Sequence, residues 1–141
     1  EVFVQDNESL SGRGVLRGLH YQIEPMAQAK LVRVALGEVL DIAVDIRKSS
    51  PHFGKVYSYI LDDQKHDQLF VPRGFAHGFV VLSETAIFQY KVDNFYSMEH
   101  ERGVLFNDPA LGIDWKLNTA LLSTSDKDRV LPLFKDAHYF V

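Results

Sequence analysis

Residues 14–22 have the sequence Gly-Val-Leu-Arg-Gly-Leu-His-Tyr-Gln, which predicts a β-strand that carries several functional groups. An ordinary half-buried strand alternates apolar and polar residues, but here Arg17, His20 and Gln22 interrupt the apolar ones. Gly18 predicts a bulge or a close approach of another backbone segment. Polar groups that a fold must satisfy at a cost often have a function, so we interpret this strand as part of a site. The alternative is an edge strand with a hydrogen-bonded histidine.

The rest of the sequence also predicts short strands and turns, with no helical periodicity before residue 116. Residues 29–36 and 39–46 predict one hairpin, and residues 73–82 and 86–92 predict a second. Short strands separated by turns at intervals of roughly ten residues predict an antiparallel sandwich or barrel. The expected fold class is therefore all-β.

The C-terminal part of the sequence predicts short helical segments. Residues 117–122 predict one helical turn, and Ser125 predicts the cap of another over residues 125–129. The chain has 141 residues, of which 46% are hydrophobic, which is enough for one domain with a real core. No repeat, low-complexity segment or linker divides it, so we expect a single domain over residues 1–141.

Composition excludes several classes of protein. The formal net charge is −4 and no basic stripe gathers the Lys and Arg residues, so we expect no nucleic-acid partner. The absence of cysteine excludes disulfides, thiolate metal sites and a cysteine nucleophile. No apolar run approaches the length of a membrane span and no signal-peptide pattern is present, so we expect a soluble, cytoplasmic protein without a membrane partner.

The strand at residues 39–46 separates apolar residues from carboxylates. Its period of two places Leu40, Ile42 and Val44 on one face and Asp41 and Asp45 on the other. The carboxylates therefore face either solvent or a pocket.

Residues 72–77, Pro-Arg-Gly-Phe-Ala-His, have the form P-x-G-x-x-H, a tight turn that leads a histidine into the following strand. Together with the turn at Gly37 and the strand of His20, this resembles the cupin double motif on a jelly-roll barrel. Metal-binding cupins supply H-x-H and a glutamate in the first half, whereas Gln22 stands at the position of the second histidine. Two histidines alone make a poor site for zinc or iron, so we expect no metal.

A series of motifs resembles the RmlC family, the dTDP-4-dehydrorhamnose 3,5-epimerases, from residue 3 to about residue 134. The motifs are Phe3-Val4-Gln5-Asp6-Asn7, Val15-Leu16-Arg17-Gly18-Leu19-His20-Tyr21-Gln22, Lys30-Leu31-Val32-Arg33, Gly37-Glu38-Val39 with Asp41, Val44-Asp45-Ile46-Arg47 with Ser50-Pro51, Pro72-Arg73-Gly74-Phe75-Ala76-His77-Gly78-Phe79, and Phe106-Asn107-Asp108-Pro109 with Gly112-Ile113-Asp114-Trp115. The resemblance implies a cupin jelly roll and a homodimer. It also implies an enzyme of rhamnose biosynthesis that inverts C3 and C5 of a dTDP-4-keto-6-deoxyhexose. Both protons are α to a carbonyl, so a base and an acid suffice and no cofactor is expected.

The resemblance also implies catalytic roles for four residues. His20 matches the family's base, and Asp128, in Ser125-Asp126-Lys127-Asp128, matches the carboxylate that orients it. Tyr90 matches the proton donor, the alternative being a core tyrosine whose hydroxyl finds a partner. Lys30 matches the residue beside the keto oxygen, where an ammonium stabilises the developing oxyanion. We interpret Asp108, in its Asn-Asp-Pro sequence, as a turn-forming residue.

Substrate-binding roles follow from the same resemblance. Arg17 suits a diphosphate oxygen, since a guanidinium fork holds such groups well. His77 matches a donor to the sugar, and Asp41 is expected to orient a cation or a histidine, with an exposed carboxylate as the alternative. The remaining expected binding residues are Gln5, Asp6 and Asn7 for base or sugar, Tyr96 for stacking, and Glu101 and Lys127. Met98 stands where the family often has proline, which leaves the shape of its loop open.

The N-terminus departs from the family pattern. Family members carry an Asp-Glu-Arg-Gly-Phe type motif upstream that joins the substrate site, whereas this chain starts at Glu1 in strand pattern and without Met. We therefore expect that this segment is missing from the sequence. The alternatives left open are a 3-only or 5-only epimerase, a ketoisomerase, and a non-catalytic sugar-nucleotide binding module. A metal-dependent cupin oxygenase is disfavoured by the missing second histidine.

Overall fold

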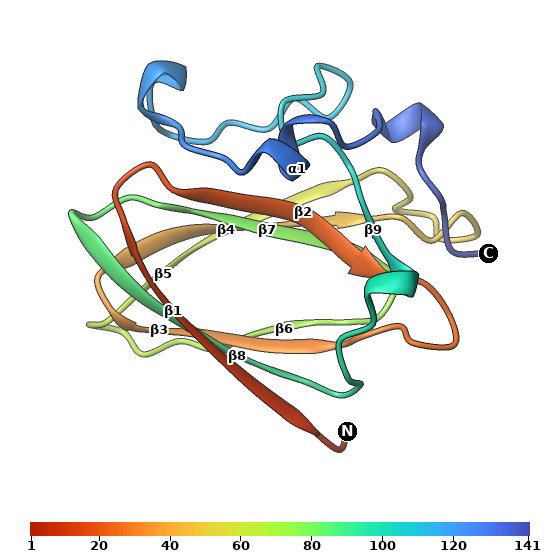
Figure 1. The fold of residues 1–141 in the computed structure, drawn as a ribbon, viewed down its shortest axis with the longest axis horizontal. Helices are drawn as coiled ribbons and strands as arrows, with labels where there is room; N and C mark the ends of the chain where they lie inside the picture. The colour runs from red at the N-terminus through yellow and green to blue at the C-terminus, as the bar shows by residue number, and fades with distance from the viewer.

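The computed structural model describes all 141 residues, and nine strands form two antiparallel sheets that face each other (Figure 1). One sheet has the strand order β1-β8-β3-β6 and the other β5-β4-β7-β2-β9. The strands are β1 (Gln5–Gly12), β2 (Leu16–Gln22), β3 (Lys30–Leu36), β4 (Glu38–Asp45), β5 (Val56–Asp62), β6 (Leu69–Val71), β7 (Phe75–Val81), β8 (Thr85–Val92) and β9 (Glu101–Gly103). The helical segments are α1 (Asp126–Arg129) and the 3₁₀ turns η1 (Met98–His100), η2 (Thr119–Leu121) and η3 (Phe134–Asp136). The expected all-β jelly roll with short C-terminal helical segments is confirmed.

The sheet that contains β2, β4 and β7 is buried on both faces. Between the two sheets lies a cluster that includes Val32, Phe79 and Phe88. On the other face of this sheet, a second cluster that includes Leu40 and Ile42 packs beneath the C-terminal tail, which Figure 1 shows in blue above β2, β4 and β7. Burial on both faces stabilises this central sheet and makes it a rigid support for the side chains that it carries.

Both predicted hairpins are wrong. The strand β3 pairs with β6 and β8, while β4, which follows it directly, pairs with β5 and β7 in the facing sheet. The strands β7 and β8 are likewise in different sheets. A short connection fits a corner between sheets as well as a hairpin, and the choice depends on strand partners that are distant in the sequence. At one corner Gly37 adopts φ 83°, where a Cβ atom would lie 2.2 Å from the Thr85 carbonyl oxygen.

The two carboxylates of β4 are buried, so the solvent-facing alternative is wrong. Asp41 is 1% exposed and Asp45 is fully buried. Asp45 accepts hydrogen bonds from Arg47 and from the Ser50 hydroxyl, at 2.6 Å for the latter. Burial alone raises the pKa of Asp45, but these hydrogen bonds and the Arg47 charge outweigh it and lower the pKa to about 2. Asp45 is therefore a structural anchor of the 45–50 turn, whereas Asp41 faces the space between the sheets.

The C-terminal tail contains the predicted helical segments, with η2 inside residues 117–122 and α1 after Ser125. The Ser125 hydroxyl accepts a hydrogen bond from the Asp128 backbone N–H at 3.1 Å, which is the expected helix cap. Asp108 accepts hydrogen bonds from the Ala110 and Phe134 N–H groups, so its predicted turn-forming role is confirmed. No helix of the chain has the length and apolar character needed to cross a membrane.

The predicted bulge in β2 is present at Gly18. The register of β2 against β7 is interrupted between Arg17 and His20. Gly18 has φ 120°, and a Cβ atom there would lie 2.7 Å from Gly78 Cα and from the His77 carbonyl oxygen. The sheet therefore requires a glycine at this position, next to His20.

We predict that Gly18→Ala lowers the free energy of unfolding by about 3 kcal/mol, because it combines backbone strain with an overlap against immovable backbone. The measurement is the urea unfolding midpoint. Gly112→Ala is the matched control: Gly112 also has positive φ, at 59°, but nothing lies within 4 Å of its Cβ position. The control is expected to lose only about 1 kcal/mol. Equal losses in the two variants would contradict the close-approach explanation.

Candidate active site

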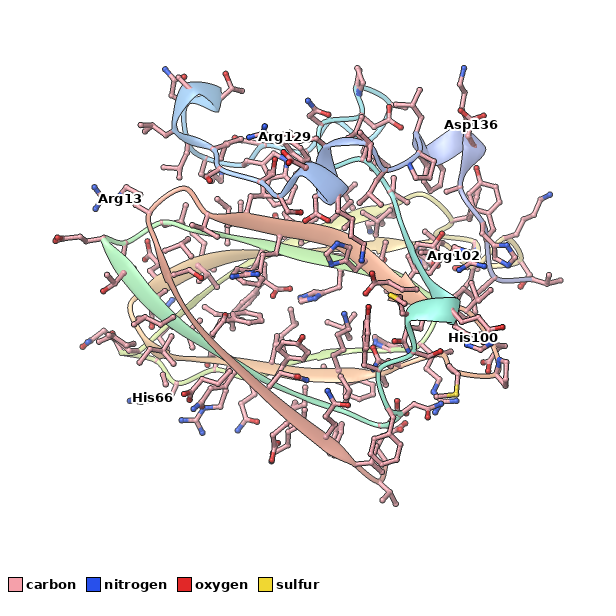
Figure 2. All side chains as sticks on the ribbon, in the orientation of Figure 1. Arg13, His66, His100, Arg102, Arg129 and Asp136 are labelled. Carbon is pink, nitrogen blue, oxygen red and sulfur yellow. The ribbon has the colours of Figure 1, made fainter.

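A cleft of about 600 Å³ opens between the two sheets beside the C-terminal tail. Figure 2 shows nitrogen- and oxygen-bearing side chains projecting into the space between the sheets. The cleft brings together residues from both sheets and from the tail. Its polar lining includes Asn7, Glu8, Ser9, Arg17, His20, Lys30, His77, Tyr90, Ser123, Thr124, Ser125, Lys127 and Asp128.

His20 and Asp128 form a hydrogen-bonded pair although they lie 108 residues apart in sequence. The distance from His20 Nε2 to Asp128 Oδ1 is 2.6 Å, and Asp128 Oδ2 accepts the Gly18 N–H at 3.0 Å. An ionised carboxylate only accepts hydrogen bonds, so we assign the proton to Nε2, which leaves the lone pair on Nδ1. The His20 side chain is 29% exposed and Asp128 only 4%. This is the geometry of a base held in one orientation and one tautomer by a buried carboxylate.

The ionisation of Asp128 depends on its hydrogen bonds. Burial raises the pKa of this carboxyl, but the hydrogen bonds from His20 and from the Gly18 N–H outweigh burial and hold the pKa below its usual value. The bulge at Gly18 thus serves two purposes, because it lets β2 approach β7 and it aims a backbone N–H at Asp128. The carboxylate stays charged and can stabilise an imidazolium on His20.

Tyr90 approaches the cleft from the opposite sheet. It lies on β8 directly across from Asn7 of β1 and Val32 of β3, with its ring 5.9 Å from that of Phe88. No protein group bonds to its hydroxyl, so the alternative of a core tyrosine with a satisfied hydroxyl does not hold. Burial raises its pKa and the positive charge of Arg17 lowers it, with burial prevailing. Tyr90 is therefore a neutral phenol with its proton free to be donated.

Lys30 lies beside Tyr90 on the inner face of the same sheet. Its Nζ is 5.8 Å from the centre of the Tyr90 ring and has no carboxylate within ion-pair distance. Removal of the ammonium from water lowers the pKa of Lys30 to about 8, although the negative charge of Asp41 opposes the shift. An ammonium here is poised to stabilise negative charge in the cleft.

His77 and Asp41 form a second histidine–carboxylate pair, at 2.8 Å from Nε2 to Oδ2. Both residues are buried, and the other carboxylate oxygen of Asp41 has no partner. The expected orienting role of Asp41 toward a histidine agrees with this contact, and the exposed-carboxylate alternative is wrong. No cluster of three or more potential metal ligands occurs.

A smaller pocket of about 150 Å³ adjoins the cleft and shares His20, Lys30 and Tyr90 with it. It is rich in amides and contains most of the remaining expected binding residues. Gln5, Asn7, Tyr96 and Glu101 line it. The Tyr96 N–H donates to the Gln5 side chain at 3.3 Å, and Gln5 donates to Asn7 at 3.0 Å. Glu101 forms an ion pair with Lys127, which links this pocket to the main cleft.

Among the expected binding residues, Asp6 and Asp41 line neither the cleft nor the adjoining pocket. Asp41 still contacts His77, whereas the side chain of Asp6 bonds to no residue of the cleft. The alternation of β1 places it on the outer face of the sheet, where it is 76% exposed and forms an ion pair with Lys91 at 2.8 Å. Its neighbours Gln5 and Asn7 face inward because side chains alternate along a strand. Three adjacent residues of one sequence motif therefore do not all belong to the same site.

Several cleft residues were not expected from the sequence: Glu8, Ser9, Ser123 and Thr124. Glu8 and Ser9 lie in β1, and Ser123 and Thr124 lie in the irregular tail, so nothing in their local sequence distinguishes them as cleft residues. Gln22, at the position of the missing cupin histidine, has a structural role. Its amide donates to the Met26 and Phe95 carbonyls, and its oxygen accepts the Ser97 N–H at 2.8 Å. Gln22 thus fixes the loop that carries Tyr96, and the loop continues into η1, where Met98 is exposed.

Comparison with known proteins identifies the family. The family described as dTDP-4-dehydrorhamnose 3,5-epimerase matches residues 1–136. The enzyme of that name from Shigella flexneri is 57% identical over 139 residues, which cover 99% of this chain and 76% of the relative. The crystal structure of the Elizabethkingia anophelis enzyme superimposes with a TM-score of 0.95 at 57% identity, covering 96% of this chain and 74% of that one.

A further solved structure contains a bound sugar nucleotide. The enzyme from Legionella pneumophila, in complex with dTDP-4-keto-L-rhamnose, has a TM-score of 0.91 and 48% identity, over 96% of this chain and 71% of that one. Matches of this identity and coverage establish both the fold and the family of this chain. The chain belongs to the dTDP-4-dehydrorhamnose 3,5-epimerase family.

Proposed function

We propose that this chain inverts C3 and C5 of a dTDP-4-keto-6-deoxyhexose through enolate intermediates, as a step of dTDP-L-rhamnose biosynthesis. The observation that carries the proposal is the placement of a carboxylate-oriented base, His20, and a neutral phenol, Tyr90, on facing sheets of one cleft. A sugar ring held between them would present one face to the base and the other to the acid. Family membership supports the same reaction.

In the proposed reaction, Nδ1 of His20 removes the proton on a carbon next to the keto group. The C–H electron pair forms the enolate, whose oxygen takes the negative charge beside the Lys30 ammonium. Tyr90 then delivers its hydroxyl proton to the opposite face of the same carbon, which inverts that carbon. Asp128 stabilises the imidazolium in the meantime.

Other residues would hold the substrate in place. Arg17 and Lys127 supply positive charge on the walls of the cleft for the diphosphate. His77 is oriented by Asp41 through its Nε2 and would present Nδ1 to the sugar, where a neutral ring accepts a hydrogen bond from a hydroxyl group and the expected donor role requires the imidazolium. Tyr96 and the amides of Gln5 and Asn7 would form the adjoining nucleoside pocket. Asp6 has no contact that supports a binding role.

The proposal includes a homodimer in the cytoplasm that uses no cofactor, no membrane and no nucleic acid. The family resemblance supports the dimer. Light scattering on the purified protein measures the mass directly, and a value at twice 16.1 kDa would support it.

The reaction is tested by NMR in D₂O with dTDP-4-keto-6-deoxyglucose and no added metal. Deuterium at both C3 and C5 of the product would support the proposal. Deuterium at one carbon would indicate a 3-only or 5-only epimerase, and migration of the keto group a ketoisomerase. A bound but unlabelled ligand would indicate a binding module.

We predict that kcat/KM falls above a pH of about 8, because Lys30 must stay protonated to stabilise the enolate and its pKa is about 8. The pKa of Tyr90 is raised above its ordinary value, so ionisation of this phenol does not cause the fall in kcat/KM near pH 8. The measurement is the pH profile of the first proton exchanged from substrate. In Lys30→Arg the fall in kcat/KM is expected at higher pH, since a guanidinium stays charged. If the fall stays near pH 8 in this variant, it is caused by the titration of a group other than Lys30.

A further inference from the structure

Inversion of two carbons by one base and one acid requires the catalytic groups to be reset between the steps. After the first inversion His20 carries a proton and Tyr90 has lost one. The His20 side chain is 29% exposed and can release its proton to water. Tyr90 is only partly exposed, and its hydroxyl has no protein hydrogen bond through which a proton could return. The structure must therefore supply a nearby acid for Tyr90 while the substrate still fills the cleft.

Lys30 is the acid that the fold places beside Tyr90. In the pairing of β3 with β8, Lys30 stands opposite Val92 and Tyr90 opposite Val32, so Lys30 and Tyr90 are diagonal neighbours on the inner face. The Lys30 Nζ lies 5.8 Å from the centre of the Tyr90 ring. Both residues line the cleft and the adjoining pocket, and neither is bound to another side chain.

The other donors around Tyr90 are less suited to this transfer. Arg17 approaches Tyr90 closely enough to lower its pKa, but a guanidinium does not release its proton in proteins. His20 and His77 lie on the facing sheet, each with Nε2 bound to its own carboxylate. Lys127 forms an ion pair with Glu101. Asn7, across from Tyr90, is not an acid.

We propose, on the basis of the function proposed above, that Lys30 returns the proton to Tyr90 between the two inversions. In this step one N–H bond of the Lys30 ammonium breaks and the O–H bond of Tyr90 forms, so a phenolate and an ammonium become a phenol and an amine. Lys30 then takes a proton from water in the cleft, and the proton that His20 releases balances it. Lys30 thus has two roles, as the charge beside the enolate and as the donor that resets the acid.

The acidities agree with the direction of transfer. The pKa of Lys30 is lowered to about 8, whereas burial raises that of Tyr90 above its ordinary value of 10.0, so the proton moves downhill to the phenolate. The positive charge of Arg17 stabilises the phenolate until the transfer occurs.

The test separates the two inversions. Enzyme in excess is mixed with dTDP-4-keto-6-deoxyglucose in D₂O, and quenched samples are scored by NMR for sugar inverted at one carbon or at both. Lys30→Arg keeps the positive charge but cannot donate, so we expect its first inversion to proceed and its second to slow by about 100-fold, with singly inverted sugar accumulating. In Lys30→Ala, added methylammonium is expected to restore the second inversion. Lys91→Arg, on the outer face of β8, is the matched control and is expected to match the unsubstituted protein.

Accumulation of singly inverted sugar in Lys30→Arg, with rescue by the amine in Lys30→Ala, supports the relay. An unchanged ratio of singly to doubly inverted sugar in Lys30→Arg, whatever the overall rate, overturns it and leaves the proposed function in place. Absence of deuterium with the unsubstituted protein overturns both.

Discussion

Replacing His20 by asparagine is expected to lower kcat for epimerisation by about 10⁴-fold, because His20 is the accessible base of the cleft. Its side chain is 29% exposed, whereas the side chain of His77, the other histidine paired with a carboxylate, is only 6% exposed. Asp128→Asn is expected to lower kcat by about 10²-fold, since an amide in place of the carboxylate no longer fixes the tautomer or stabilises the imidazolium. The double variant is expected to be no slower than His20→Asn alone, because the two residues act as a unit. Steady-state kinetics on the three variants measures these effects.

The controls for this series separate catalysis from folding. His52→Asn removes an exposed histidine outside the cleft and is expected to keep full activity. Thermal unfolding of each variant shows whether the fold persists. If the loss of kcat in the double variant equals the product of the two single losses, the two residues act independently. If His20→Asn retains activity within tenfold of the unsubstituted protein, His20 is not the base.

Tyr90→Phe is expected to lower the rate of inversion by about 10³-fold while proton exchange continues. His20 still forms the enolate in this variant, and the deuterated imidazolium returns a deuteron to the face from which the proton left. The substrate should therefore gain deuterium with its configuration retained. NMR in D₂O measures label and configuration in one experiment.

The fold should tolerate this change, because the Tyr90 hydroxyl has no protein hydrogen bond to lose. Tyr57→Phe is the matched control, since Tyr57 is 40% exposed, lies outside the cleft and likewise has no protein hydrogen bond to its hydroxyl. Loss of exchange and of inversion to the same extent would contradict the assignment, because it would place Tyr90 in enolate formation rather than in reprotonation.

Several parts of the site could be predicted from local features of the sequence. The polar groups of residues 14–22, the glycine of the bulge and the Ser125 cap are each defined by a few adjacent residues, and all are found as expected. The P-x-G-x-x-H turn likewise places His77 at the start of β7. Resemblance to the family added the long-range pairing of His20 with Asp128, which periodicity alone does not reveal.

The structure decided the points at which two arrangements were locally equivalent. A short turn after β3 suited a hairpin or a corner, and partners such as β5, β7 and β8 selected the corner. The sequence left open whether the carboxylates of β4 face solvent or a pocket. In the structure the C-terminal tail covers the apolar face of β4, and Asp41 on the opposite face contacts His77 between the two sheets. Side-chain alternation along β1 places Asp6 on the outer face of the sheet, although its neighbours Gln5 and Asn7 line the adjoining pocket.

The sequence by itself determined the class of fold, the chemical groups available and the turns that depend on neighbouring residues. Only the tertiary structure decided which groups meet, because contacts such as His20 with Asp128 or Lys30 with Tyr90 depend on strand partners and on a tail that are far away along the chain. It also decided the acidity of Lys30, since that shift comes from removal of the ammonium from water when the two sheets close around it.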